Sequence, residues 1–173
     1  MGSRIIGGGL ILATLLGAIL VGSKIVIGLT APPLPIAGER APTYSATTLQ
    51  GAPIGSSALA GQVVMLDFWA SWCPGCMASL PNMRRLAERF EGKGVTVIGV
   101  SQEPDDVAGV REIVREKGLR YPIVLDHGAV RDAFRIRALP TVVVIDQRGV
   151  VRAVHEGPVT EDNLAWDIVQ LLD

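Results

Sequence analysis

The two cysteines of the chain, Cys73 and Cys76, lie two residues apart in the segment DFWASWCPGCMASL. A pair at this spacing has three chemical uses: half of a zinc site, a structural disulfide, or two thiols that are oxidised and reduced in turn. Two cysteines on one helical turn can close a small disulfide ring. The elements that position the pair help to decide among the three uses.

The residues on either side of the cysteines predict a strand followed by a helix. The apolar run VVMLDFW, residues 63–69, is typical of a strand buried on both faces. From about Pro74 to Glu91 apolar side chains recur at helical spacing. Cys73 would therefore end the strand, where backbone N–H groups and the helix dipole stabilise a thiolate and lower the pKa below the free value of ~8.5. Cys76 would lie in the first helical turn, after Pro74 at the first helical position.

Strands and helices alternate along the rest of the chain. Residues 44–49 and a short strand after the turn at Gln50–Gly51 predict a β-hairpin before the first buried strand. Further strands are expected at residues 95–101, 121–126, 141–146 and 150–155. Further helices are expected from Pro104 to about Lys117, over residues 129–136, and over residues 161–172 after a Thr160 cap. This order predicts an α/β fold with a parallel core sheet, helices on both faces and an antiparallel edge.

The N-terminal residues predict a membrane anchor. Residues 5–23 carry no charged side chain, and at helical rise they would span roughly 28 Å, about the hydrocarbon thickness of a bilayer. Arg4 precedes this run and no acidic residue occurs before Glu39, so the positive-inside bias places the N-terminus in the cytoplasm. A cleaved signal peptide is the alternative, because the small residues before Lys24 weakly resemble a cleavage site.

The expected organisation is a signal-anchor over residues 1–30, a Pro-rich linker over residues 31–42 and one domain over residues 43–173. The catalytic domain would then lie on the extracytoplasmic side of the cell membrane, where disulfides persist. A domain of this size does not need a disulfide for stability. The formal net charge is −1 and no basic stripe interleaves with aromatic residues, so nothing indicates nucleic-acid binding.

Two segments resemble the signatures of one family. Residues 38–83, GERAPTYSATTLQGAPIGSSALAGQVVMLDFWASWCPGCMASLPNM, and residues 136–151, IRALPTVVVIDQRGVV, are similar to those of the membrane-anchored TlpA/ResA-like thiol–disulfide oxidoreductases of the thioredoxin superfamily. The resemblance covers about residues 38–172. It implies a thioredoxin-like fold, a central mixed sheet flanked by helices with an N-terminal β-hairpin extension and an N-terminal transmembrane helix. It also implies a redox-active Cys73–Cys76 disulfide with no other cofactor.

The resemblance also implies a client-binding site around the cysteines. Pro140 would be a cis-proline that places the Leu139 backbone beside Cys73, where an extended client segment can pair with it. Trp72 and Leu139 would form an apolar collar. Pro74 and Gly75, the dipeptide between the cysteines, would tune the redox potential, and many relatives have proline in the second place.

The implied activity is reduction of protein disulfides outside the cytoplasm. Cys73 would attack a client disulfide and Cys76 would resolve the mixed disulfide. Electrons would come from a membrane thiol–disulfide carrier. Apocytochrome c is one expected client, because some relatives serve haem attachment. A stress-type or general disulfide reductant is an equally open alternative.

One departure from the family pattern concerns proton transfer. Many relatives carry Glu three residues after the second cysteine, whereas this chain has Ser79. Asp67, on the buried strand, would point under the CxxC turn in a thioredoxin-like topology, and burial would raise its pKa. We expect Asp67 to accept the proton of Cys76. The alternative is a buried polar residue whose hydrogen bonds are all satisfied.

Other functions of the cysteine pair fit the sequence less well. A zinc site needs about four ligands, and the chain adds only the isolated His127 and His155. A copper metallochaperone on the same fold remains the main alternative, although such proteins use CxxxC spacing. A peroxidase would need Thr three residues before Cys73, where this chain has Ala70. A purely structural disulfide would leave the Pro140 signature and the Trp72 collar unexplained.

Overall fold

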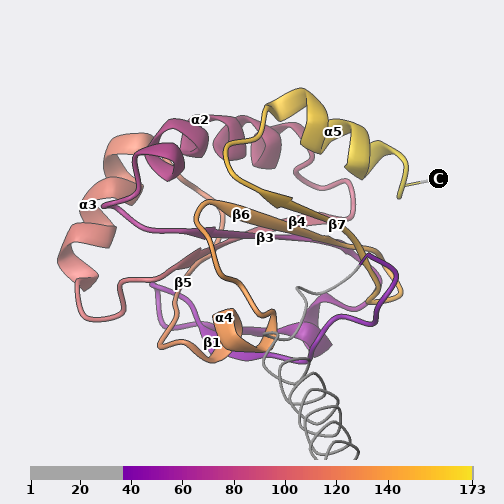
Figure 1. Cartoon of the computed structure of the whole chain (residues 1–173), viewed down its shortest axis with the longest axis horizontal. Helices are drawn as coiled ribbons and strands as arrows, with labels where there is room; N and C mark the ends of the chain where they lie inside the picture. The colour runs from indigo at the N-terminus through magenta and orange to yellow at the C-terminus, as the bar shows by residue number, and fades with distance from the viewer. Residues whose placement is uncertain (1–36, 173) are drawn as a thin grey trace, which may run out of the picture. The chain divides into compact units, whose positions relative to one another are not determined.

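The structure of the protein is a computed structural model that describes residues 37–172 (Figure 1). The predicted anchor over residues 1–30 and the linker residues up to 36 lie outside this range. Within residues 37–172, no helix is both long enough and apolar enough to cross a bilayer.

A five-stranded mixed sheet forms the centre of the described domain. Its strands are β3 (Val63–Trp69), β4 (Val95–Ser101), β5 (Ile123–Leu125), β6 (Thr141–Ile145) and β7 (Val151–Glu156), in the spatial order β5-β4-β3-β6-β7. The first three are parallel, β6 is antiparallel to β3, and β7 is antiparallel to β6. The parallel strands are joined through helices, because a connection between parallel strands must cross from one end of the sheet to the other. This arrangement confirms the predicted thioredoxin-like α/β fold with a central mixed sheet.

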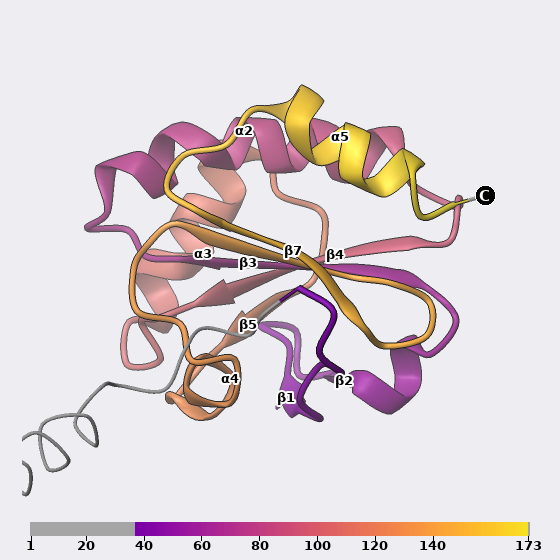
Figure 2. The same ribbon diagram turned by 45° about the vertical axis from the view of Figure 1, so that its right-hand side comes forward.

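Helices cover both faces of the sheet, as Figures 1 and 2 show. One face packs against α2 (Pro74–Arg89), α3 (Val107–Lys117) and α5 (Glu161–Val169). The other face packs against the short α4 (Ala129–Ala133), the 3₁₀ turn η2 (Ser56–Leu59) and the hairpin of β1 (Ser45–Thr47) and β2 (Pro53–Gly55).

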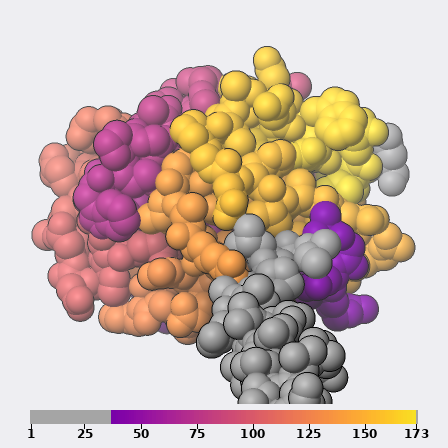
Figure 3. All heavy atoms as spheres, viewed as in Figure 1, coloured from indigo at the N-terminus to yellow at the C-terminus, as the bar shows by residue number. Residues whose placement is uncertain are grey.

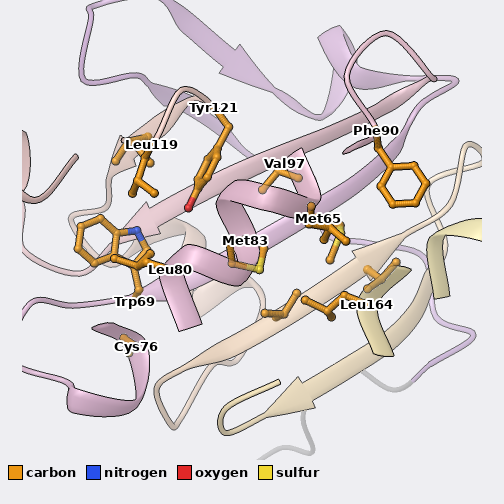
Figure 4. Packing of buried hydrophobic residues seen from close by; sticks show 14 of the residues in the cluster. Met65, Trp69, Cys76, Leu80, Met83, Phe90, Val97, Leu119, Tyr121 and Leu164 are labelled. Carbon is orange, nitrogen blue, oxygen red and sulfur yellow. The ribbon is translucent and has the colours of Figure 1, made fainter. Parts of the chain in front are cut away.

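The side chains of β3 alternate between two hydrophobic cores, because successive residues of a strand point to opposite faces. Met65 and Trp69 belong to the core under α2 (Figure 4), whereas Leu66 and Phe68 belong to the core on the α4 side. Asp67 lies between Met65 and Trp69 in this alternation, so it shares the face that α2 covers. The strand therefore brings one carboxyl group beneath the helix that carries Cys76.

The segment before β3 pairs with both outer edges of the sheet. Residues 38–41 bond to residues 149–151 at the start of β7, including Gly38 N to the carbonyl oxygen of Val151 at 2.7 Å. Leu49 N donates to the carbonyl oxygen of Ile123 on β5, also at 2.7 Å. Backbone hydrogen bonds thus attach the N-terminal extension to both edge strands of the sheet, β7 and β5.

The prediction that a helix begins at Pro104 and runs to about Lys117 is wrong about where the helix begins. In the structure α3 begins at Val107, and Asp106 precedes it as the N-cap. The Asp106 carboxylate accepts a hydrogen bond from Gly109 N at 2.9 Å. A carboxylate that caps the backbone N–H groups satisfies donors that a proline at the first helical position leaves open.

Candidate active site

The cysteine pair lies at the turn between β3 and α2. Cys73 is the N-cap residue of α2, and Pro74 occupies the first helical turn. Cys73 and Cys76 form a disulfide with their Cα atoms 5.2 Å apart. The predicted pairing is confirmed. Cys73 was expected to end the strand, but β3 ends at Trp69 and a short turn leads from there to Cys73 at the start of α2.

The start of α2 directs its N–H groups at the sulfur of Cys73. The backbone N–H of Cys76 donates to Cys73 Sγ at 3.2 Å. These N–H groups and the positive end of the helix dipole favour an anion at this position. After reduction, the same geometry stabilises a Cys73 thiolate, which is the nucleophile in thiol–disulfide exchange.

The two sulfurs differ in accessibility. In the disulfide state Cys73 is 7 % exposed and Cys76 is 1 % exposed. Trp72, directly before the pair, is 68 % exposed. Cys73 is therefore the more exposed residue of the pair, and it follows directly after an exposed apolar side chain.

The Leu139–Pro140 loop lies against the cysteine turn, as predicted. The Leu139–Pro140 peptide bond is cis. A Cβ atom built on Gly75 would lie 3.3 Å from Pro140 Cδ and 3.3 Å from Pro158 Cγ, so Gly75 is packed between two proline rings. Figure 3 shows the turn and the start of α2, in magenta, beside the orange segment that precedes β6. Pro158 was not expected at the site, although Gly157–Pro158 marks a loop.

A second residue that the sequence did not indicate holds the turn before the cysteines. Both the backbone N–H and the hydroxyl of Ser71 donate to the Glu103 carboxylate. Glu103 follows β4, whose last residue, Ser101, accepts a hydrogen bond from Glu103 N at 3.3 Å. The carboxylate therefore connects the turn that carries Trp72 to the end of the neighbouring strand.

Asp67 is buried beneath α2. It is 2 % exposed, and burial raises its pKa from 3.8 to about 7. No residue in the described part of the chain donates a hydrogen bond to its Oδ2 atom. The alternative expectation, a carboxyl group with all its hydrogen bonds satisfied, is therefore not met for this oxygen by any protein group of residues 37–172.

Ser79, at the place where many relatives carry Glu, is occupied within its own helix. It is 5 % exposed, and its hydroxyl donates to the carbonyl oxygen of Gly75 at 2.9 Å. A hydroxyl does not accept a proton near neutral pH. Asp67 is thus the carboxyl group that the structure places on the α2 side of β3.

The two histidines lie away from the cysteine pair in sequence and have other surroundings. His127 is exposed, and His155 forms a contact of 2.6 Å with the Asp167 carboxylate. Among residues 37–172, no three His, Cys, Asp or Glu side chains are grouped so that they could hold a metal ion.

A redox disulfide at a helix N-terminus, packed against a cis-proline loop on a mixed sheet, defines a thioredoxin-fold thiol–disulfide oxidoreductase. Comparison with known proteins agrees. The AhpC/TSA family model matches residues 37–154. The thiol-disulfide oxidoreductase ResA of Halalkalibacterium halodurans is 37% identical over 126 residues, which cover 72% of this chain and 71% of ResA.

Solved structures give the same result. A thioredoxin family thiol:disulfide interchange protein from Chlorobium tepidum superposes with a TM-score of 0.73 at 26% identity, over 80% of this chain and 99% of that chain. StoA from Bacillus subtilis has a TM-score of 0.65 at 25% identity, over 79% of this chain and 98% of that chain. The chain belongs to the AhpC/TSA family and is a ResA-like thiol–disulfide oxidoreductase of the thioredoxin superfamily.

Proposed function

We propose that the protein is a membrane-tethered, extracytoplasmic reductant of protein disulfides. The observation that carries the proposal is the Cys73–Cys76 disulfide at the start of α2, packed against the Leu139–Pro140 loop. The ResA relative supports the oxidoreductase activity. The reducing direction follows from the resemblance to TlpA/ResA-like reductants.

The proposed reaction begins with the reduced cysteine pair. The Cys73 thiolate attacks one sulfur of a client disulfide, so the client's sulfur–sulfur bond breaks and its other sulfur leaves as a thiolate. Cys76 then loses its proton and attacks Cys73 Sγ. The Cys73–Cys76 disulfide forms, and the first client sulfur also leaves as a thiolate. Two electrons pass from the protein to the client, and both client thiolates take up protons.

Asp67 is the proposed proton acceptor for Cys76. Burial disfavours the thiolate form of Cys76, so a base close to the thiol is needed to take its proton. A carboxyl group whose pKa is about 7 accepts and returns a proton near neutral pH. The protonated Asp67 can afterwards give the proton to the departing client thiolate.

The proton step is tested with Asp67→Asn, which keeps the size of the side chain. Exchange near neutral pH should slow by about 10-fold or more. The measurement is stopped-flow resolution of a preformed mixed disulfide between about pH 6 and pH 9. Unchanged rates in a folded variant would exclude Asp67 as the proton acceptor without affecting the oxidoreductase activity.

The surroundings of Cys73 suit a protein client. Trp72 is exposed and Leu139 is half-buried, so both side chains can offer apolar surface to a client that reaches Cys73. Three cavities of about 320 to 380 Å³ lie elsewhere and have other linings. We propose that an extended client segment pairs with the Leu139 backbone, and that apocytochrome c is one such client.

The midpoint potential of the Cys73–Cys76 couple tests the direction of electron flow. A value near −270 mV, as in thioredoxin, is expected for a reductant, and one near −120 mV would mark an oxidant. The potential is read by equilibrating the purified protein with redox buffers. A Cys73→Ser Cys76→Ser variant provides the control for non-specific thiol reactions.

The tether is proposed from residues 5–23, and the electron donor is proposed to be a membrane thiol–disulfide carrier. The full chain should be found in the membrane fraction, and protease should reach its domain only from outside. Soluble protein with a new N-terminus near Lys24 would instead show a cleaved signal peptide.

A further inference from the structure

Three buried polar atoms lie on the α2 side of the sheet without a hydrogen-bond partner among residues 37–172. They are Asp67 Oδ2, Trp69 Nε1 and the Tyr121 hydroxyl. Trp69 is 0% exposed and Tyr121 is 7% exposed. An unsatisfied buried polar group is costly, so three in one region of a core require a physical reason.

The three groups come together around Gly99. Gly99 on β4 is the register partner of Asp67 on β3. A Cβ atom built on Gly99 would lie 2.6 Å from Ile123 Cδ1, 3.0 Å from Trp69 Nε1 and 3.2 Å from Tyr121 Cε2. The missing side chain of Gly99 therefore leaves room for the indole nitrogen and the tyrosine ring. In Figure 4 the Tyr121 oxygen points toward the side of the core where the Trp69 nitrogen lies.

The hydrogen-bonding capacities of the three groups are complementary to one water molecule. An indole N–H only donates, a carboxylate oxygen only accepts, and a phenol does both. A water can accept from Trp69, donate to Asp67 and bond to the Tyr121 hydroxyl. Buried waters in proteins make about three hydrogen bonds, to groups that are otherwise unsatisfied.

We propose that Tyr121 is a positioning residue for Asp67, and that its hydroxyl and the Trp69 indole hold a shared buried water against the carboxyl group. The proposal rests on the proposed role of Asp67 as proton acceptor. The water donates to the ionised carboxylate and stabilises it after each proton leaves. Tyr121 thereby sets the pH range in which Asp67 accepts the proton of Cys76.

The groups around Asp67 leave Tyr121 as its main polar neighbour. The neighbouring strands place Gly99 and Val142 opposite Asp67, and neither carries a charge. From α2 the titratable group in this core is Cys76, whereas α3 and α5 contribute apolar residues. Burial, and then the charge of Asp67, raise the pKa of Tyr121 well above its usual value, so Tyr121 remains a neutral donor.

Tyr121 also lines a groove of about 380 Å³ that runs between the end of α2 and the start of β4. The residue therefore borders both the buried cluster and a groove at the surface.

Tyr121→Phe tests the proposal, because it removes the hydroxyl and keeps the ring. The pH profile for resolution of a preformed mixed disulfide should shift upward by about 0.5 to 1 pH unit, because the water that donates to the ionised carboxyl group loses one of the hydrogen bonds that hold it. Rates below neutral pH should fall about 3- to 10-fold, and the high-pH plateau should not change.

Tyr44→Phe is the matched control. Tyr44 also carries a buried hydroxyl without a partner among residues 37–172, but it packs in the core on the opposite face of the sheet. Its variant should keep the original profile. A profile shifted equally in both variants would overturn the proposal, because the effect would then be general to loss of a buried hydroxyl.

Two further results separate this proposal from the proton step itself. If Asp67→Asn removes the inflection of the profile and Tyr121→Phe does not shift it, the Tyr121 proposal is wrong and the role of Asp67 stands. If Asp67→Asn leaves the profile unchanged, both fail. A high-resolution crystal structure should show one ordered water bonded to all three groups, and an empty or apolar space there would also overturn the proposal.

Discussion

At the residue scale, the same burial that suits Asp67 to its proposed role as proton acceptor also destabilises the fold. Burial moves its pKa from 3.8 to about 7, which is close to the pH at which a proton acceptor works best. The shift of about 3 units corresponds to an upper bound on the order of 4 kcal/mol, because each unit is about 1.4 kcal/mol. Burial of Asp67, the residue that we propose as the proton acceptor, thus lowers the stability of the fold.

The pH dependence of stability should show this cost. Between about pH 4 and pH 7 the unfolded chain loses the Asp67 proton while the folded chain keeps it, so this residue progressively favours unfolding as pH rises. Above about pH 7 both states are ionised and the effect is constant. The oxidised Asp67→Asn variant should therefore be more stable than the unaltered protein, by a difference that grows from about pH 4 to pH 7 and reaches up to a few kcal/mol. Urea denaturation at several pH values measures the difference, and a gain that grows as pH falls would contradict it.

The order of the two cysteines in the reaction is a second prediction at this scale. Cys76→Ser should accumulate mixed disulfides with clients, because Cys73 remains reactive and nothing resolves the product. Cys73→Ser should not, because the remaining thiol is covered by the first turn of α2 and is 1 % exposed in the oxidised state. Non-reducing gels with a disulfide-containing client show the adducts. Adducts formed by Cys73→Ser alone would reverse the assignment.

At the scale of elements, the active turn is held from three directions. The start of α2 donates to Cys73, the loop before β6 packs on Gly75, and Glu103 after β4 binds Ser71. Each contact joins segments that lie at the same end of the sheet, where β3 and β4 finish and β6 begins. Rigid elements of this kind hold a reactive group in place more accurately than a loop alone.

The Glu103 contact should contribute measurably to stability. Glu103→Ala removes a carboxylate that accepts two hydrogen bonds from Ser71. Because such bonds are charge-assisted but only partly buried here, we expect a loss of about 2 kcal/mol in the free energy of unfolding. Urea denaturation measures it, with Glu91→Ala, an exposed acidic residue after α2, as the control. Equal effects of the two substitutions would show that the Ser71 contact contributes nothing specific.

The strands and the main helix were predictable because their patterns are local. The apolar runs of β3 and β4 have the bounds expected from sequence, and α2 begins at Pro74 as predicted. The start of α3 was not predicted correctly, because Pro104 and Asp106 are both favourable near a helix N-terminus. Only the capping geometry decides between them.

The supporting parts of the site were less predictable than the cysteines. Glu103 lies 32 residues from Ser71. Tyr121 comes near Asp67 only because Gly99, the register partner of Asp67 on β4, lies beside the Tyr121 ring. Neither residue has a distinctive type or spacing in the sequence. Contacts of this kind depend on how strands pair in three dimensions, and a single sequence does not contain that information in a local pattern.

At the scale of the whole described domain, one sheet separates two hydrophobic cores. The core under α2 contains the cysteines and Asp67, whereas the opposite core is covered by α4 and the β1–β2 hairpin. A change in the second core can therefore alter stability without touching the redox site. This separation is what makes Tyr44 usable as a control for Tyr121.

The backbone bonds between the N-terminal extension and the outer strands also bear on solubility. An open sheet edge is a template onto which another chain can add a strand, which leads to aggregation. Here residues 38–41 cover the start of β7, and Leu49 bonds to β5 at the other edge. We therefore expect the extension to protect the protein from edge-to-edge association.

Truncation tests this protective effect. A chain that starts at residue 42 loses the cover of β7 but keeps the β1–β2 hairpin, whereas a chain that starts at residue 37 keeps both. The shorter chain should self-associate more strongly as concentration rises, as measured by light scattering at equal concentrations. If the two chains associate equally, residues 38–41 are not what keeps copies of this sheet apart. If only the shorter chain aggregates, a few backbone hydrogen bonds far from the cysteines determine whether the enzyme stays in solution.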